Sequence, residues 1–129
     1  MRLVAVNPPS LAKPRGFNHG MKGRGVLFVA GQIGWDAAGR VVSRDVGEQF
    51  AQALDNVLAV VAAAGGKPQA IARMTVYVTD KRAYRRRTKQ IGAAWRRRFG
   101  KHFPAMALVE VRSLLEDAAK VEIEATALL

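Results

Sequence analysis

The chain has 129 residues, half of them apolar, and a formal net charge of +11 from 21 basic and 10 acidic side chains. This length and apolar content predict one α/β domain, spanning residues 1–129, with a single hydrophobic core. The absence of cysteine excludes a disulfide framework, a thiolate nucleophile and a cysteine-based zinc site, and two isolated histidines make a poor metal-binding set. No apolar run approaches the roughly 18 residues of a membrane span, and prolines interrupt the amino terminus before a signal-peptide core forms. We therefore expect a cytoplasmic protein without a membrane partner or a bound metal.

The first half of the chain predicts a buried strand followed by a helix. Residues 26–30 form a short apolar run that Gly31 closes, which is typical of a buried strand. Asp45 and Glu48 have the spacing of a capping box, and the helix that they introduce ends at the glycine pair 65–66. Its apolar residues recur at steps of three and four and predict one buried face: Val46, Phe50, Leu54, Val57 and Val61.

The second half predicts a strand, a basic helix and two further strands. Residues 71–79 alternate between apolar and polar side chains, and Asp80 is placed to cap a helix that runs to Phe99. Segments 105–112 and 120–127 also alternate and are joined by the short connection 113–119. On the predicted helix, one side is apolar and the other carries a basic stripe of Arg82, Arg85, Arg86, Lys89, Arg96 and Arg97.

These elements predict one sheet with both helices packed on one side. We expect Met106 and Leu108 to share the opposite, polar face with Thr75 and Tyr77, which would suit a subunit interface better than open solvent. An oligomer is the expected result, since symmetric assembly is the common way to cover such a face. The last two strands together are interpreted as the wall of a small-molecule site.

Several segments in register resemble the Rid family, also called YjgF or L-PSP. The resemblance covers nearly the whole chain and is carried by residues 28–33, 54–59, 62–66, 75–80, 104–105, 109–111 and 121–125. It implies a chorismate-mutase-like fold, a mixed sheet with two helices on one face, assembled as a homotrimer with small-molecule clefts between subunits. It also implies hydrolysis of reactive imines and enamines, above all 2-iminoacids, to ketoacids and ammonia without a cofactor.

The resemblance also assigns candidate site residues. Glu122 matches the glutamate that positions the attacking water, Phe17 falls near an aromatic position of the family without its hydroxyl, and Gly31 keeps its place. Met106 stands where the family has the arginine that binds the substrate carboxylate, and a thioether cannot replace that donor fork. We therefore expect a metabolite with an apolar portion near Met106, Leu108 and Phe17 rather than an ordinary 2-iminoacid. A glutamate beside an apolar cleft should have a raised pKa, which suits acid or base catalysis.

Alternatives remain open at several of these residues. Arg112 lies roughly 20 Å along the strand from Met106 and cannot reach it, whereas Arg15, Arg24 or Arg87 could enter the cleft from another segment or subunit. Met106 could pack in the core or at a subunit interface instead of lining a cleft. Trp35 could lie at the rim of the cleft or pack on the subunit surface. His19 could contact a ligand at the mouth of the cleft or have a purely structural role.

Two other functions compete with hydrolysis. One is a noncatalytic metabolite-binding module that uses the same cleft. The other is nonspecific, ribonuclease-like nucleic-acid binding by the basic stripe. A solvated helix face explains the stripe more simply, because it lacks the interleaved aromatic residues that stack on bases.

Overall fold

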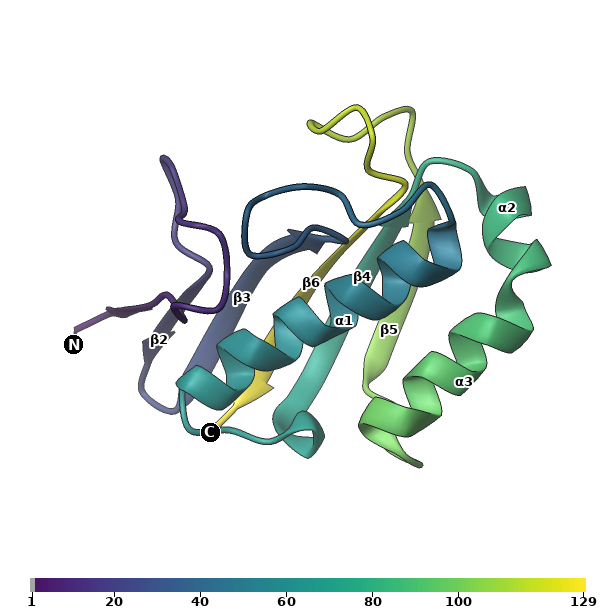
Figure 1. The fold of residues 1–129 in the computed structure, drawn as a ribbon. Coiled ribbons are helices and arrows are strands. Elements are labelled where there is room, and N and C mark those ends of the chain that lie inside the picture. The colour runs from purple at the N-terminus through teal and green to yellow at the C-terminus, as the bar shows by residue number, and fades with distance from the viewer. Residues whose placement is uncertain (1) are drawn as a thin grey trace.

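The protein, described here for residues 2–129 by a computed structural model, is a single mixed sheet with helices on one side (Figure 1). Its strand order is β1-β2-β3-β6-β4-β5. Every neighbouring pair is antiparallel except β4 and β5, which run parallel. The six strands are β1 (Val4–Val6), β2 (Gly20–Gly23), β3 (Val26–Ile33), β4 (Ile71–Val78), β5 (Ala105–Glu110) and β6 (Val121–Leu128).

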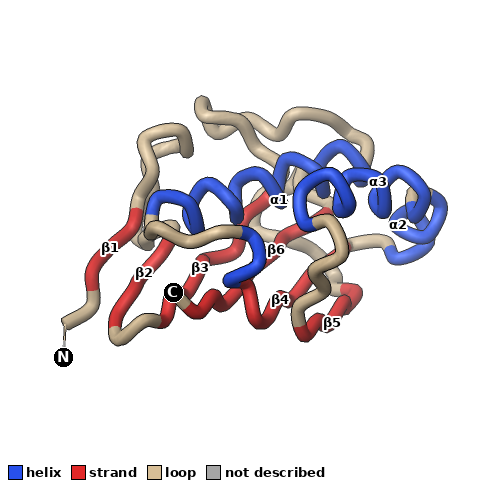
Figure 2. The backbone as a smooth tube through the Cα atoms, turned by 90° about the horizontal axis from the view of Figure 1, so that it is seen from below, coloured by secondary structure: helices blue, strands red, loops and turns tan. Residues whose placement is uncertain are grey.

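Three α-helices cover one face of this sheet, as the sequence predicted in outline (Figure 2). They are α1 (Val46–Ala63), α2 (Lys81–Arg86) and α3 (Thr88–Phe99), with a short 3-10 turn, η1 (Pro68–Ala70), before β4. The predicted cap of α1 is confirmed, since an Asp45 carboxylate oxygen accepts the Glu48 backbone N–H at 3.0 Å.

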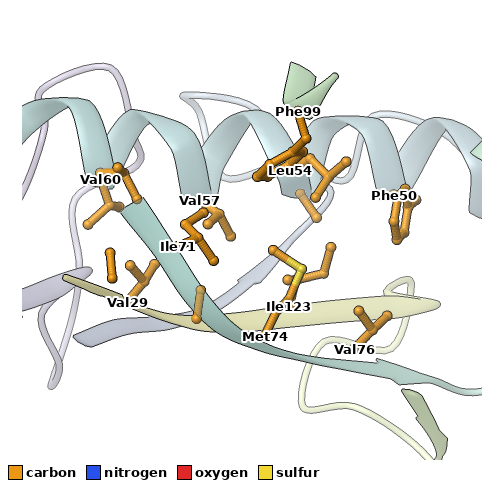
Figure 3. Packing of buried hydrophobic residues seen from close by; sticks show 14 of the residues in the cluster. Val29, Phe50, Leu54, Val57, Val60, Ile71, Met74, Val76, Phe99 and Ile123 are labelled. Atoms are coloured by element: carbon orange, nitrogen blue, oxygen red, sulfur yellow. The ribbon is translucent and has the colours of Figure 1, made fainter. Parts of the chain in front are cut away.

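The hydrophobic core lies between α1, α3 and the covered face of the sheet (Figure 3). Phe50, Leu54 and Val57 of α1 meet Met74 of β4 and Ile123 of β6, and each of these side chains is at most 1% exposed. The apolar faces predicted for the first helix and for the strand at 71–79 are therefore confirmed. No helix among residues 2–129 has the length and apolarity that crossing a membrane requires.

The second predicted helix is interrupted at Arg87, which separates α2 from α3. Arg87 has φ −110° and ψ 14°, outside the α-helical range, and its N–H bonds to the Tyr84 carbonyl in a tighter turn. Its side chain instead binds Asp45 at the start of α1, with Nε 2.6 Å from a carboxylate oxygen. Helical periodicity continues across the break, so a pattern of apolar spacing does not reveal it.

The two carboxy-terminal strands are not neighbours, contrary to their interpretation as one wall. β6 lies between β3 and β4, while β5 pairs only with β4 and forms the edge of the sheet. Because the α2–α3 segment crosses over between β4 and β5, these two strands run parallel. β1 and β2 at the other edge were not predicted, since the residues of β2 include two glycines and a lysine and show no strand pattern.

The predicted face of Met106 and Leu108 is wrong. In the parallel register Met106 stands beside Met74, and Leu108 beside Val76, so both point to the helix side of the sheet. Ala105, Ala107 and Val109 occupy the open face instead.

Candidate active site

A pocket forms at the end of the sheet where β3 finishes and β6 begins. The β3–β6 ladder shifts register between Val29 and Gln32, which leaves Ala30 and Gly31 in an irregularity of the kind that re-aims side chains beside functional sites. Ile33 then pairs with Glu122, the second residue of β6. The resulting pocket has a volume of about 340 Å³, and its walls include Phe17, Gly31, Ile33, Trp35, Leu115 and Glu122.

The carboxyl group of Glu122 lies directly against Gly31. A Cβ atom placed on Gly31 would come within 2.8 Å of the Glu122 Cδ and 3.1 Å of its Oε2. Any side chain at position 31 would therefore displace the carboxyl group. Two of the predicted site residues thus depend on each other, and the glycine is required by space rather than by backbone conformation.

Two neighbouring carboxylates on β6 have different environments. Glu122 is half-buried, and burial raises its pKa above the ordinary value, with a further rise from the negative charge of Glu124. Glu124 is exposed and accepts a 2.7 Å hydrogen bond from the Tyr77 hydroxyl, which raises the pKa of that tyrosine. The raised pKa makes Glu122 the candidate acid or base of this pocket.

His19 is a structural residue that fixes the segment carrying Phe17. It is 1% exposed, with Nε2 2.7 Å from the Ala12 carbonyl and Nδ1 3.1 Å from the side-chain nitrogen of Gln32. The Phe17 ring packs edge-on against the imidazole at a centroid distance of 5.2 Å. Of the two interpretations left open for His19, the structure supports the structural one.

Met106 and Leu108 lie apart from the Glu122 pocket within one chain. Met106 contributes to a separate hollow of about 310 Å³ beside α3, whose walls include Tyr84, Trp95 and Phe103. Met106 is 45% exposed and Leu108 39% exposed on the edge strand. The structure therefore groups the predicted site residues into two sets: Phe17, Gly31 and Glu122 in one, Met106 and Leu108 in the other.

Sequence reasoning missed the contribution of the connection between β5 and β6. Leu115 and Glu116 from this segment line the Glu122 pocket, and Leu115 is fully exposed. A connecting segment has no periodicity from which its contacts could be predicted. Trp35, left open between two roles, lines the pocket from the turn after β3.

Three arginines were considered as replacements for the carboxylate-binding arginine that the family has at the position of Met106, and they lie in different parts of the structure. Arg87 is paired with Asp45, and Arg24 lies in the β2–β3 turn, at the opposite end of β3 from the Glu122 pocket. Arg15 lines a second hollow that shares Phe17 and Trp35 with the pocket.

The fold and the pocket define a class: a single α+β domain with a half-buried carboxyl group in a mostly apolar pocket. Among residues 2–129, no group of three or more histidine, aspartate or glutamate side chains is arranged to hold a metal ion.

Comparison with known proteins identifies the family. Residues 9–129 match the family model described as Endoribonuclease L-PSP. The chain is 35% identical over 128 residues to a 2-iminobutanoate/2-iminopropanoate deaminase of Salmonella typhimurium, covering 97% of this chain and 94% of the relative. It is 34% identical over 117 residues to a RutC family protein of Pyrococcus horikoshii, covering 89% of each. The crystal structure of the YjgF gene product of Escherichia coli superposes with a TM-score of 0.84 at 33% identity, covering 97% and 98% of the two chains. This chain therefore belongs to the L-PSP family, also called Rid or YjgF, and the resemblance seen in the sequence is confirmed.

Proposed function

We propose that this protein hydrolyses a small, reactive imine or enamine in the Glu122 pocket. The observation that carries the proposal is the half-buried Glu122 carboxyl group, which lies against Gly31 in a mostly apolar pocket and has a raised pKa. Deaminases of iminoacids at about one-third identity support the reaction class.

The chemistry requires one group that can take and return a proton. The imine reacts in its protonated form, and ionised Glu122 accepts a proton from water as the water oxygen bonds to the C=N carbon, which gives a neutral carbinolamine. Glu122 then returns that proton to the carbinolamine nitrogen. The C–N bond breaks and ammonia leaves, while the hydroxyl group loses its proton to solvent and becomes the carbonyl of the product. An enamine first gains a proton at carbon and then follows the same path. No step requires a cofactor.

The preferred substrate lacks a carboxylate directly beside the reacting carbon. Met106, at the position of the family's carboxylate-binding arginine, lies in a hollow lined by Tyr84, Trp95 and Phe103. That surface suits an alkyl or aromatic portion of the substrate.

The site is completed in a homotrimer under this proposal. β5 is exposed along its whole length and has one unpaired edge, and Phe28 on the open face of the sheet is 53% exposed. Neighbouring copies would cover these surfaces and bring Met106 and Leu108 of one subunit to the Glu122 pocket of another. Equilibrium sedimentation should then give three times the 14.0 kDa mass of the chain.

A matched pair of imines tests the proposed reaction. An amino acid oxidase acting on phenylalanine and a flavin amine oxidase acting on phenethylamine generate imines that differ only in the carboxylate. We expect the protein to accelerate ammonia release more from the carboxylate-free imine, and Glu122→Gln to remove that acceleration. Met106→Arg should raise the rate on the phenylalanine-derived imine by about tenfold or more, because a charged hydrogen-bonded pair contributes about 1.5 to 3 kcal/mol.

Two outcomes would redirect the assignment. Saturable binding of the phenethylamine-derived aldehyde without any turnover of its imine would indicate a noncatalytic binding module. Equal turnover by the wild-type and Glu122→Gln proteins would show that Glu122 is not the acid or base.

Nonspecific nucleic-acid binding is a second candidate, favoured by the basic stripe. Its six side chains are exposed and form no ion pair within residues 2–129, whereas Arg87 and Arg98 are paired with Asp45 and Asp55. If the basic stripe contacts phosphates, binding releases the counterions condensed on the nucleic acid. Affinity for single-stranded RNA should then fall steeply as the salt concentration rises from about 50 to 200 mM. Affinity that does not change over this range would exclude this candidate.

A further inference from the structure

A second hollow adjoins the Glu122 pocket and shares Phe17 and Trp35 with it. Its volume is about 420 Å³, and it is lined by the amino-terminal segment and by the turn after Trp35. The amino-terminal segment contributes Lys13 and Arg15 to the lining. We call this space the basic hollow. Phe17 and Trp35 thus form a boundary that the two spaces have in common.

The two basic side chains have no internal partner. Lys13 and Arg15 are exposed and form no ion pair among the described residues 2–129. Asp36, at the start of the lining turn, already accepts hydrogen bonds from the backbone of Ala38 and Arg40 at 2.9 and 3.0 Å, and its charge faces Arg40 at 3.9 Å. Glu116, on the wall of the Glu122 pocket, makes no ion pair with either residue. Both positive charges are therefore free to bind an anion.

The segment that carries these charges is held in place. The buried His19 bonds through Nε2 to the carbonyl of Ala12, directly before Lys13, and its backbone N–H donates to the Asn7 side chain at 2.8 Å. Phe17, directly after Gly16, packs on the same imidazole. Arg15 thus lies between two anchored points, which lowers the entropic cost of presenting its guanidinium group.

Trp35 lies at the boundary between the two spaces. It lines both the pocket and the basic hollow, and its indole nitrogen is buried without a hydrogen-bond partner among residues 2–129. Because Trp35 is only partly buried, its ring can pack against an apolar or aromatic part of a ligand.

We propose that Arg15, with Lys13 beside it, binds a carboxylate that the substrate carries at a distance from its C=N bond. This inference rests on the proposed function, in which Glu122 acts at the C=N carbon. The substrate class is then an imine or enamine whose carboxylate is separated from the reacting carbon by an apolar or aromatic spacer lying along Phe17 and Trp35. The guanidinium fork suits a carboxylate because it donates two parallel hydrogen bonds.

Product analogues test this assignment without requiring turnover. 3-Benzoylpropionate has an aryl ketone, a two-carbon spacer and a carboxylate, and its methyl ester has the same shape without the charge. We expect titration calorimetry to show the acid binding at least tenfold more tightly than the ester. Arg15→Ala should remove this preference, Arg15→Lys should retain part of it, and Lys13→Ala should reduce it by a smaller factor.

Two controls separate this inference from the proposed reaction. Arg97→Ala removes one positive charge from α3, away from the basic hollow, and should leave the preference for the acid intact. Glu122→Gln should keep the preference but lose turnover, so turnover that persists in that variant would contradict the proposed reaction alone. Equal affinity for acid and ester, or an unchanged preference in Arg15→Ala, would overturn the role of Arg15.

Discussion

Replacing Gly31 by alanine should separate activity from stability. The new Cβ would lie 2.8 Å from the Glu122 Cδ, closer than real Cβ contacts come, so the Glu122 side chain must move. The atoms that must yield are the end of a flexible side chain, and a rotamer shift costs about 0.5 to 1.5 kcal/mol. Gly31 is not among the glycines with positive φ, so alanine fits the backbone and recovers about 0.4 to 1 kcal/mol through the unfolded state. The free energy of unfolding should therefore change by less than about 1 kcal/mol.

Hydrolysis should nevertheless fall by roughly 100-fold, because proton transfer depends on the position of the Glu122 carboxyl group. The measurement is ammonia release from the phenethylamine-derived imine, together with urea unfolding of the same preparations.

Gly34→Ala is the matched control for this prediction. Its Cβ would lie 2.6 Å from both the Cα and the carbonyl oxygen of Gln49, backbone atoms of α1 that cannot rotate away. We expect this variant to lose about 2 to 3 kcal/mol of stability through overpacking. The reasoning would be refuted if Gly31→Ala were as unstable as Gly34→Ala, or if it kept full activity.

Two further predictions concern pH and the start of α1. Because burial raises the folded-state pKa of Glu122 above the ordinary value of a glutamate, its contribution to stability is present at low pH and is lost as pH rises from that ordinary value through the folded pKa. Over this window Glu122→Gln should become more stable relative to wild type, and a difference between the urea midpoints of the two proteins that stays constant with pH would contradict this. Asp45→Ala removes both the cap of α1 and the partner of Arg87 and should lower the free energy of unfolding by about 1 to 2 kcal/mol, whereas Asp36→Ala in the exposed turn should cost less by the same measurement.

The first helix and the covered faces of β4 and β6 followed from local patterns. The Asp45 cap and the apolar steps from Val46 to Val61 predicted α1 to within a residue at its start, because capping and periodicity are properties of a few adjacent residues. Alternation also placed Glu122 on the open face of its strand, beside Tyr77 rather than in the core. The expected rise of its pKa is confirmed in direction.

The order of the strands and the environment of each site residue depended on long-range pairing. Alternation shows which residues of one strand share a face, but neither which strand lies beside it nor in which register. Pairing of Met106 with Met74 turned the predicted apolar anchor to the helix side, and the place of β6 between β3 and β4 brought Glu122 to Gly31. The family resemblance in the sequence thus named the carboxyl group and the missing arginine, while hydrogen bonding between distant segments decided that Arg15, rather than Arg24 or Arg87, lies next to the pocket.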